Sequence, residues 1–254
     1  TLFLRQRHGV SLTAEGERLY GHISAAIGHI LRGEEEIAAD KSLKYGVVTV
    51  AASEIALHCV LLPVLKKFRK TYPGVKIRIL NYSTPQAVDT VKKGLADFAI
   101  VTEPFETASG LQSFVLRSIR EVPVCSSTFA EQEGSIKTYR QLEKYPLIGL
   151  GRNTASYGFY SDFFKKMGLS FEPDVEAATA DQILPMIRSD LGIGFVPLDF
   201  LGKTDNGSLK VLDISPAVPE RNICLLKRKG ISAGIAAGEI EKMIRANIKS
   251  TEDT

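Results

Sequence analysis

The sequence predicts an α/β protein in which one long helix precedes two lobes, each a mostly parallel sheet covered by helices. Near the N-terminus, apolar residues recur at alternating spacings of three and four, which is typical of a long helix with one apolar stripe. Further on, short apolar strands alternate with amphipathic helices in two successive series, which indicates parallel strands joined by helical crossovers. Extended segments join the two series, so we expect two lobes with a cleft between them.

The composition is that of an ordinary globular protein. Of 254 residues, 44% are hydrophobic and 24% are charged, which excludes disordered and fibrous classes. No apolar stretch approaches the roughly 20 residues of a membrane span and no secretory leader is visible, so we expect a cytoplasmic protein without a membrane partner. The three cysteines lie far apart, which favours reduced thiols over a disulfide scaffold. A formal net charge of +3 is too small to predict nucleic-acid binding by itself.

The start of the chain predicts a hairpin and then a helix. Residues 2–12 place two short apolar pieces around a basic tip, with Gly9 suited to the turn. Thr13 has the character of a helix N-cap, and the helix is expected to run to about Asp40. Its narrow stripe favours a partner helix, and the alternative is packing on its own domain. The stripe comprises Gly16, Leu19, Ile23, Ala26, Ile30, Gly33 and Ile37, of which Leu19, Ile23, Ala26 and Ile30 are the candidate dimer contacts.

The remaining elements follow in two series, with a helix containing Pro185 that we expect to be short or kinked. The first series has strands at 47–52, 75–80 and 97–101 and helices at 57–72 and 85–93, and extended chain at 111–124 leads out of it. The second has strands at 147–149, 174–177 and 193–196, helices at 156–167 and 180–188, strands at 209–214 and 223–227, and a last helix at 233–249.

Polar residues follow the predicted strands at the edge where open α/β sheets bind ligands. Hydroxyls and N–H groups at helix starts suit a polar or anionic small molecule, and Arg152 is the best candidate to pair with a carboxylate. The alternative for each residue is an ordinary role as a cap, turn former or surface charge. The candidate ligand-binding residues are Ser53, Glu54, Ser83, Thr84, Thr102, Arg152, Asn153 and Pro197.

Motifs for catalysis or metal binding are missing from the sequence. The four histidines occur without an HExxH or CxxC pattern, and there is no GxSxG or GxxxxGK[ST]. The GxG fragments at 149–151 and 192–194 are better interpreted as turns beside strands than as nucleotide sites. We therefore predict no catalytic residue, no metal site, no cofactor and no enzymatic activity.

Four segments together carry a family resemblance. They are Leu2-Phe3-x-Arg5-x-x-His8-Gly9-Val10-x-Leu12-Thr13-x-x-Gly16, Leu62-Pro63 through Tyr72-Pro73-Gly74-Val75, Lys93-Gly94-Leu95-Ala96-Asp97-Phe98-Ala99-Ile100, and Gly192-Ile-Gly194-Phe-Val-Pro197. In this order they resemble LysR-type transcriptional regulators. The first resembles the end of the family's winged helix-turn-helix, and the last two resemble elements of its effector domain.

The resemblance implies that most of the helix-turn-helix lies upstream of Thr1. The first Met of the sequence is Met167, which also indicates a piece of a longer protein or a front removed by processing. The effector domain implied is of the two-lobed, type II periplasmic-binding-protein-like kind. The domains implied are a wing remnant at 1–13, a linker and dimerisation helix at 14–45, and an effector domain at 46–254, with subdomain I at 46–122 and 228–254 and subdomain II at 123–227.

The resemblance also implies partners. The full-length protein would bind DNA as a homodimer or homotetramer, with Arg5, Arg7 and His8 as wing contacts, although family members usually carry Arg or Lys where His8 stands. A small-molecule co-inducer, with a carboxylate as one candidate class, would bind between the subdomains, and RNA polymerase is a further candidate partner. The peroxide-sensing branch uses a close cysteine pair, which the spacing of Cys125 and Cys224 does not favour.

Two other classes share the predicted fold. A solute-binding protein of a transport system should carry a signal peptide and no heptad helix. An enzyme on this fold would need a converging acid, base or nucleophile, which the sequence does not offer.

Overall fold

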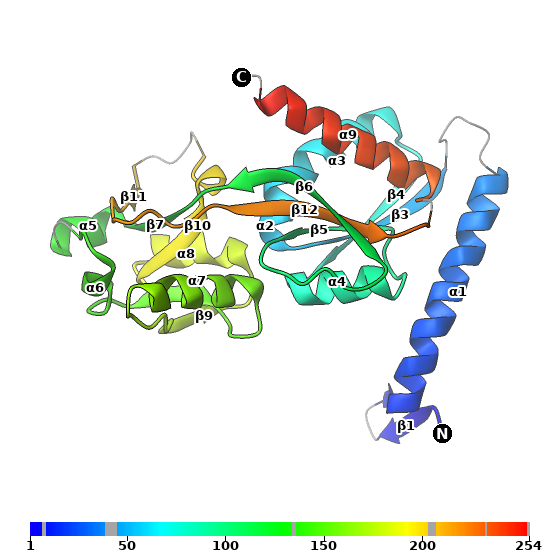
Figure 1. Ribbon diagram of the computed structural model, residues 1–254, viewed down its shortest axis with the longest axis horizontal. Coiled ribbons are helices and arrows are strands. Elements are labelled where there is room, and N and C mark those ends of the chain that lie inside the picture. The colour runs from blue at the N-terminus through cyan, green and yellow to red at the C-terminus, as the bar shows by residue number, and fades with distance from the viewer. Residues whose placement is uncertain (7–8, 39–44, 134–135, 203–206, 232, 253–254) are drawn as a thin grey trace.

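The computed structural model describes residues 1–6, 9–38, 45–133, 136–202, 207–231 and 233–252. The N-terminal hairpin and helix are confirmed. Strands β1 (Phe3–Gln6) and β2 (Gly9–Leu12) pair antiparallel. Thr13 then caps α1 (Ala14–Ala38), because its Oγ1 accepts the Gly16 N–H at 3.0 Å. Figure 1 shows α1 as one rod that projects away from the lobes.

The first lobe is a five-stranded sheet in the order β4-β3-β5-β12-β6. Alternate residues of its strands face opposite helical layers. Phe98 and Ile100 pack with α3 and α9 on one face, whereas Ala99 and Val101 pack with α4 on the other. The elements are β3 (Gly46–Ala52), α2 (Glu54–Ala56), η1 (Leu57–Leu61), α3 (Leu62–Thr71), β4 (Val75–Asn81), α4 (Thr84–Lys92), β5 (Phe98–Thr102), β6 (Leu111–Ile119), β12 (Arg221–Arg228) and α9 (Ile235–Glu252).

The second lobe is a five-stranded sheet in the order β11-β7-β10-β8-β9. One face carries an aromatic cluster around Phe164, Phe171 and Phe195, and the other packs with α8. The elements are β7 (Glu121–Ser126), α5 (Ser127–Glu133), α6 (Tyr139–Leu142), β8 (Leu147–Leu150), α7 (Ala155–Lys166), β9 (Val175–Ala177), η2 (Ala180–Gln182), α8 (Ile183–Arg188), β10 (Ile193–Pro197), η3 (Leu198–Phe200) and β11 (Leu209–Val211).

In their strand pairing the sheets are mixed and not mostly parallel as predicted, because β12 pairs antiparallel with both of its neighbours in the first sheet, as β7 does in the second. Most predicted elements are present, with three differences in their bounds or number. The helix predicted from Leu57 begins at Glu54, because Ser53 is already the N-cap and its carbonyl oxygen accepts the Leu57 N–H at 2.8 Å. The short helices α5 and α6 were not predicted, since each has too few turns to show a clear period. The strand predicted at 209–214 ends at Val211.

Both glycines of the 192–194 segment have structural roles. Gly192 has a φ of +143°, and a Cβ there would lie 2.2 Å from the Pro146 carbonyl oxygen. A Cβ on Gly194 would lie 2.6 Å from Ile183 Cγ2, so this glycine lets α8 approach β10 closely. Gly192 therefore lies beside the strand, as predicted, whereas Gly194 lies within β10 and serves its packing against α8.

Two strand crossings join the lobes, and they differ from the predicted boundaries. The chain leaves the first sheet at Arg120, between β6 and β7, and not after residue 122. It returns at Arg221, because β12 pairs with β5 and β6 of the first sheet. Residues 221–227 thus belong to the first lobe and not to subdomain II as predicted. Both crossings lie together between the lobes (Figure 1).

No helix in the described part of the chain combines the length and the apolar character needed to cross a membrane.

Candidate functional site

A cavity of about 430 Å³ lies between the lobes, within the size range of small-molecule sites. It lies at the carboxyl ends of β3, β4 and β5 of the first lobe and of β8 and β9 of the second. This is the edge at which open α/β sheets bind ligands. Its lining comprises Ser53, Glu54, Ile55, Asn81, Tyr82, Ser83, Thr84, Pro85, Gln86, Thr102, Leu150, Asn153, Thr154, Ala155, Ser156, Ala178, Thr179 and Ala180.

Four helix N-caps line this cavity. Ser53 precedes α2, Ser83 precedes α4, Thr154 precedes α7 and Thr179 precedes η2. Ser83 and Gln86 form a capping box, and Thr154 Oγ1 accepts the Tyr157 N–H at 3.2 Å. The positive dipole ends of α4 and α7 therefore lie at the cavity from opposite lobes, which favours groups that accept hydrogen bonds.

Ser53 contributes a buried hydroxyl to the cavity wall. Ser53 is only 7% exposed, and its Oγ has no hydrogen-bond partner among the described residues. Thr84 is also buried, but its Oγ1 donates to the Thr102 carbonyl oxygen at 3.2 Å. Burying a hydroxyl without a hydrogen-bond partner costs free energy, because the bond that it makes to water in the unfolded chain is lost. A ligand that forms a hydrogen bond with this hydroxyl would recover part of that cost.

Glu54 is the one acidic or basic side chain among the described residues that line the cavity. Its side chain is 10% exposed. The Asn81 Nδ2 donates to Oε2, and His58 Nε2 lies 2.8 Å from Oε1. The ring of His58 packs edge-on against Phe200. The cavity thus combines one carboxylate with neutral hydroxyls, amides and helix N-termini.

Six of the eight predicted ligand residues line the cavity, and two do not. Ser53, Glu54, Ser83, Thr84, Thr102 and Asn153 meet there. The placement of Arg152 in the cleft was wrong: it is exposed, and its guanidinium lies 5.7 Å from the centre of the Tyr157 ring. Because Thr154 is the N-cap of α7, Asn153 and Thr154 face the cavity, whereas Arg152 lines an open depression beside it.

Pro197, the second, does not line the cavity either. The residue is buried and lines a small internal gap with Glu121, Ser156 and Tyr160. The N–H of the next residue, Leu198, donates to the Arg120 carbonyl oxygen at 2.9 Å. The end of β10 is therefore held against the strand crossing and not against the cavity.

Sequence reasoning missed several lining residues. Thr179 follows the strand predicted at 174–177 and precedes the helix predicted at 180–188, so the pattern that identified Ser53 applies equally to Thr179 and could have found it. The other polar lining residues missed are Asn81, Tyr82, Gln86 and Ser156.

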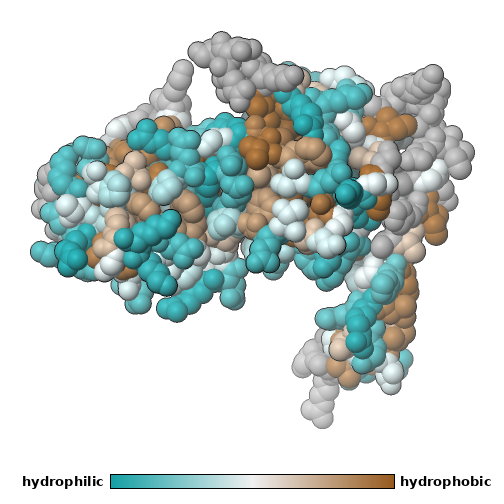
Figure 2. All heavy atoms as spheres, in the orientation of Figure 1, coloured by the Kyte–Doolittle hydropathy of each residue, from teal (hydrophilic) through white to brown (hydrophobic). Residues whose placement is uncertain are grey.

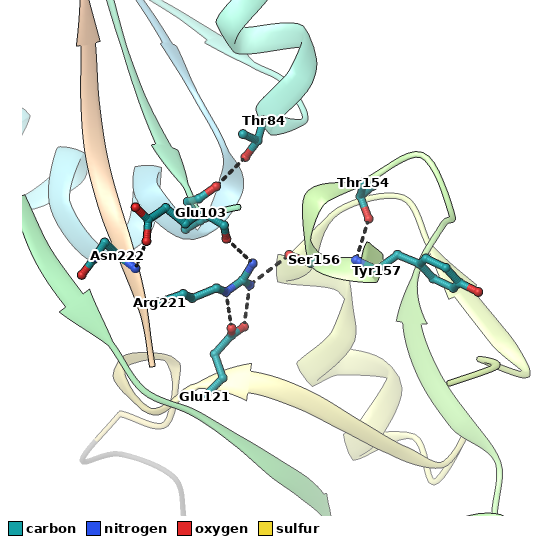
Figure 3. Close-up of polar contacts among 9 residues, drawn as sticks. Thr84, Glu103, Glu121, Thr154, Ser156, Tyr157, Arg221 and Asn222 are labelled. Atoms are coloured by element: carbon teal, nitrogen blue, oxygen red, sulfur yellow. Dashed lines mark hydrogen bonds and ion pairs between the residues drawn. The ribbon is translucent and has the colours of Figure 1, made fainter. Parts of the chain in front are cut away.

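A buried ion pair joins the two strand crossings behind the cavity (Figure 3). Arg221, at the start of β12, contacts Glu121, at the start of β7, through Nε–Oε2 at 2.5 Å and Nη2–Oε1 at 3.0 Å. Both side chains are 2% exposed. Although burial acts to lower the pKa of Arg221, the attraction of Glu121 raises it, so the guanidinium stays charged.

The same guanidinium contacts both lobes beside the site. Its Nη2 donates to Ser156 Oγ at 3.0 Å, and Ser156 lines the cavity from the second lobe. Its Nη1 donates to the carbonyl oxygen of Glu103, which directly follows β5 of the first lobe, at 3.0 Å. The Phe159 ring centre lies 4.8 Å from its carbon Cζ. Arg221 therefore links the crossings to the cavity wall at Ser156 and to Glu103, the residue after the lining residue Thr102.

The apolar stripe of α1 is exposed. Leu19, Ile23 and Ile30 are 40%, 46% and 61% exposed, and Ile27 lies beside them with 51%. Ala26 is exposed as well. Figure 2 shows hydrophobic residues gathered along one edge of this helix. Among the predicted wing contacts, Arg5 is exposed on β1, whereas Arg7 and His8 lie outside the described residues.

The three cysteines are unsuited to thiolate chemistry. Cys125 and Cys224 lie in different sheets. Burial, with the nearby negative charge of Asp199, raises the pKa of Cys59 to about 12. Burial, with the charge of Glu103, raises that of Cys224 to about 11, and burial also raises the pKa of Cys125. No group of three or more His, Cys, Asp and Glu side chains with metal-binding geometry occurs within the described ranges.

At mildly alkaline pH, we expect each cysteine of the folded chain to react with iodoacetamide at least about tenfold more slowly than the thiol of glutathione does. The thiolate is the reactive form, and the raised pKa values keep these thiols protonated. Mass spectrometry after timed quenching measures this, and the urea-unfolded chain, with all three thiols reacting at the ordinary rate, is the control. Any cysteine labelled at the glutathione rate in the folded chain would contradict the assignment.

Comparison with known proteins identifies relatives over most of the chain. Residues 42–246 match the family model described as LysR substrate binding domain. HTH-type transcriptional regulator AlsR of Bacillus subtilis is 26% identical over 207 residues, covering 78% of this chain and 66% of that protein. HTH-type transcriptional regulator CysB of Burkholderia cenocepacia is 27% identical over 197 residues, covering 75% and 62%. The chain thus spans less than two thirds of the length of these curated relatives.

Solved structures confirm the predicted two-lobed, type II periplasmic-binding-protein-like fold. The regulatory domain of Synechocystis CcmR, in complex with 2-PG, superposes with a TM-score of 0.71 at 17% identity, covering 80% of this chain and 98% of that domain. The effector-binding domain of QuiR, in complex with shikimate, gives 0.68 at 14% identity, covering 81% and 98%. At this identity the likeness establishes the fold alone.

Proposed function

This chain belongs to the family of LysR substrate-binding domains, and we propose that it is the effector-binding part of a DNA-binding transcriptional regulator. The observation that carries the proposal is the cavity between the lobes, where capped helices from both sheets meet around the unpartnered hydroxyl of Ser53. The relatives are transcriptional regulators, and CcmR and QuiR are solved with small molecules bound. The rival class, a solute-binding protein of a transport system, does not account for the exposed apolar stripe of α1.

The proposed mechanism acts through the arrangement of the lobes. A ligand can shift that arrangement only by binding one form more tightly than the other. A ligand that touches Ser53 and Thr84 of the first lobe and Asn153 of the second makes its full set of contacts in one arrangement. Since the lobes are joined at the crossings held by Arg221 and Glu121, closure would take place about this pair.

The other parts of the proposal concern the full-length protein. We propose that α1 forms the dimer contact, that dimers or tetramers bind DNA in the cytoplasm, and that Arg5, with Arg7 and His8, contacts phosphate groups. Ligand-driven movement of the lobes would change the spacing of the DNA-binding heads, and RNA polymerase is a further partner. We propose no chemical reaction for the cavity.

The test is Ser53→Ala, in a thermal-shift screen of small carboxylates, amino acids and sugar phosphates followed by calorimetry. The hydroxyl of Ser53 makes no cap hydrogen bond, so its removal should leave the Tm of the free chain unchanged or slightly raised. Binding of any compound identified should weaken about tenfold, the effect of one lost hydrogen bond to a polar ligand.

The control is Ser170→Ala, because Ser170 is exposed and lies outside the cavity wall. Undiminished affinity in Ser53→Ala, or a screen in which no compound binds, would contradict the proposed site.

A further inference from the structure

The charges of the cavity restrict the chemistry of its ligand. Besides Glu54, the described lining carries neither a lysine nor an arginine, and Arg152, the predicted partner of a carboxylate, lies outside it. A ligand whose only charge is negative would therefore meet one carboxylate in a lining that holds neither lysine nor arginine, because the nearby Arg221 is paired with Glu121 and His58 contacts Glu54 itself. Like charges repel at short range, and more strongly beside a largely buried carboxylate than in bulk water.

Glu54 is held in place as an acceptor. It lies in the first turn of a helix that continues through η1 and α3 to Thr71, directly after the Ser53 cap. Asn81 and His58 each supply one contact to its two oxygens. A carboxylate offers roughly four acceptor positions, so these two contacts leave capacity for a further donor. A buried carboxylate is stabilised most by a cationic donor, because charge-assisted hydrogen bonds are about twice as strong as neutral ones.

The part of the cavity next to Glu54 favours an anionic group and not a cationic one. Ser53 Oγ is buried without a partner among the described residues, and the N-termini of α4 and α7 face the cavity from opposite lobes. These groups favour an acceptor such as a carboxylate. Because Ser53 and Glu54 are adjacent in sequence and both line the cavity, the two preferences act on one small ligand.

We propose that the effector is a small zwitterion of the amino-acid type, whose ammonium group binds Glu54 and whose carboxylate binds Ser53 and the helix N-termini. This inference rests on the proposed function, since it assigns the ligand class of the same cavity. It replaces the expectation of a carboxylate paired with Arg152.

The experiment uses calorimetry on the 254-residue chain with paired probes that differ at one group. Each amino acid is titrated beside the hydroxy acid of the same skeleton: serine with glycerate, aspartate with malate, and glutamate with 2-hydroxyglutarate. We expect the amino acid to bind at least about tenfold more tightly in one pair or more, because only its ammonium group forms a charge-assisted bond to Glu54.

Variants assign that preference to Glu54. Glu54→Gln should remove the difference between the members of the pair, whereas Glu54→Asp, which keeps the charge, should retain most of it. Glu131→Gln removes an exposed carboxylate on α5 and should leave the preference unchanged. Circular dichroism and the Tm of each variant show whether its fold is intact.

Two results would overturn the inference. In the first, hydroxy acids bind as tightly as their amino acid partners or more tightly, and Glu54→Gln improves their binding. If Ser53→Ala still weakens the binding of these hydroxy acids, the proposed site stands and only the ligand class fails. The second is no binding by any probe in the panel. The wider screen with Ser53→Ala then decides the proposed function separately.

Discussion

Replacing Arg221 with methionine is expected to lower the free energy of unfolding by about 3–5 kcal/mol. The substitution leaves the carboxylate of Glu121 buried without its cation, since both side chains are 2% exposed. It also removes the donors to Ser156 Oγ and to the Glu103 carbonyl oxygen. Urea unfolding, followed by circular dichroism and by tyrosine fluorescence because the chain has no tryptophan, measures the loss of stability. Coincident transitions by the two signals test two-state behaviour.

A second arginine provides the matched control. Arg117, on β6, pairs with Asp199 at 2.6 Å, but these side chains are 24% and 35% exposed. Arg117→Met should therefore lower the free energy of unfolding by no more than about 1 kcal/mol, as is usual for exposed pairs. The double variant Arg221→Met with Glu121→Met should be more stable than Arg221→Met alone, because no buried charge remains. Equal losses in Arg221→Met and Arg117→Met would contradict the special role of the buried pair.

Much of the cavity could be predicted from chain order. The carboxyl ends of parallel strands meet at one edge of a sheet, so polar residues such as Ser53, directly after β3, and Thr102, the last residue of β5, had to lie near one another. That rule cannot say which side chain of a loop faces inward. In the segment 151–154, either Asn153 or Thr154 could cap α7, and the choice of Thr154 turns Arg152 away from the cavity.

The features that sequence reasoning missed depend on tertiary pairing. Glu121 and Arg221 are 100 residues apart, and neither belongs to a local motif. The membership of β12 in the first sheet depends on its partners β5 and β6 and not on its own apolar pattern, so the predicted crossing at 227 was too late. Hydrophobic periodicity identifies a strand, but the register that brings two distant strands together is a property of the whole fold.

Replacing Ile23 with aspartate is expected to dissociate the proposed dimer. The side chains of Leu19, Ile23 and Ile30 are 40–61% exposed along one stripe of α1, which a second copy of the helix would cover. In a symmetric dimer the substitution places two uncompensated carboxylates in an apolar seam. We expect the dissociation constant to rise at least about 100-fold, which corresponds to roughly 3 kcal/mol.

Light scattering over a range of concentrations measures the effect, and Gly21→Asp is the control on the same helix. Gly21 lies two residues from Ile23 and about 160° around the helix, outside the apolar stripe. A Cβ at Gly21 meets no atom within 4 Å, so the same charge can be introduced there without a clash. Gly21→Asp should keep the mass of the dimer while Ile23→Asp shifts toward the monomer. If both variants keep the same mass as the unmodified chain, α1 does not hold the copies together, and the stripe must be covered in another way.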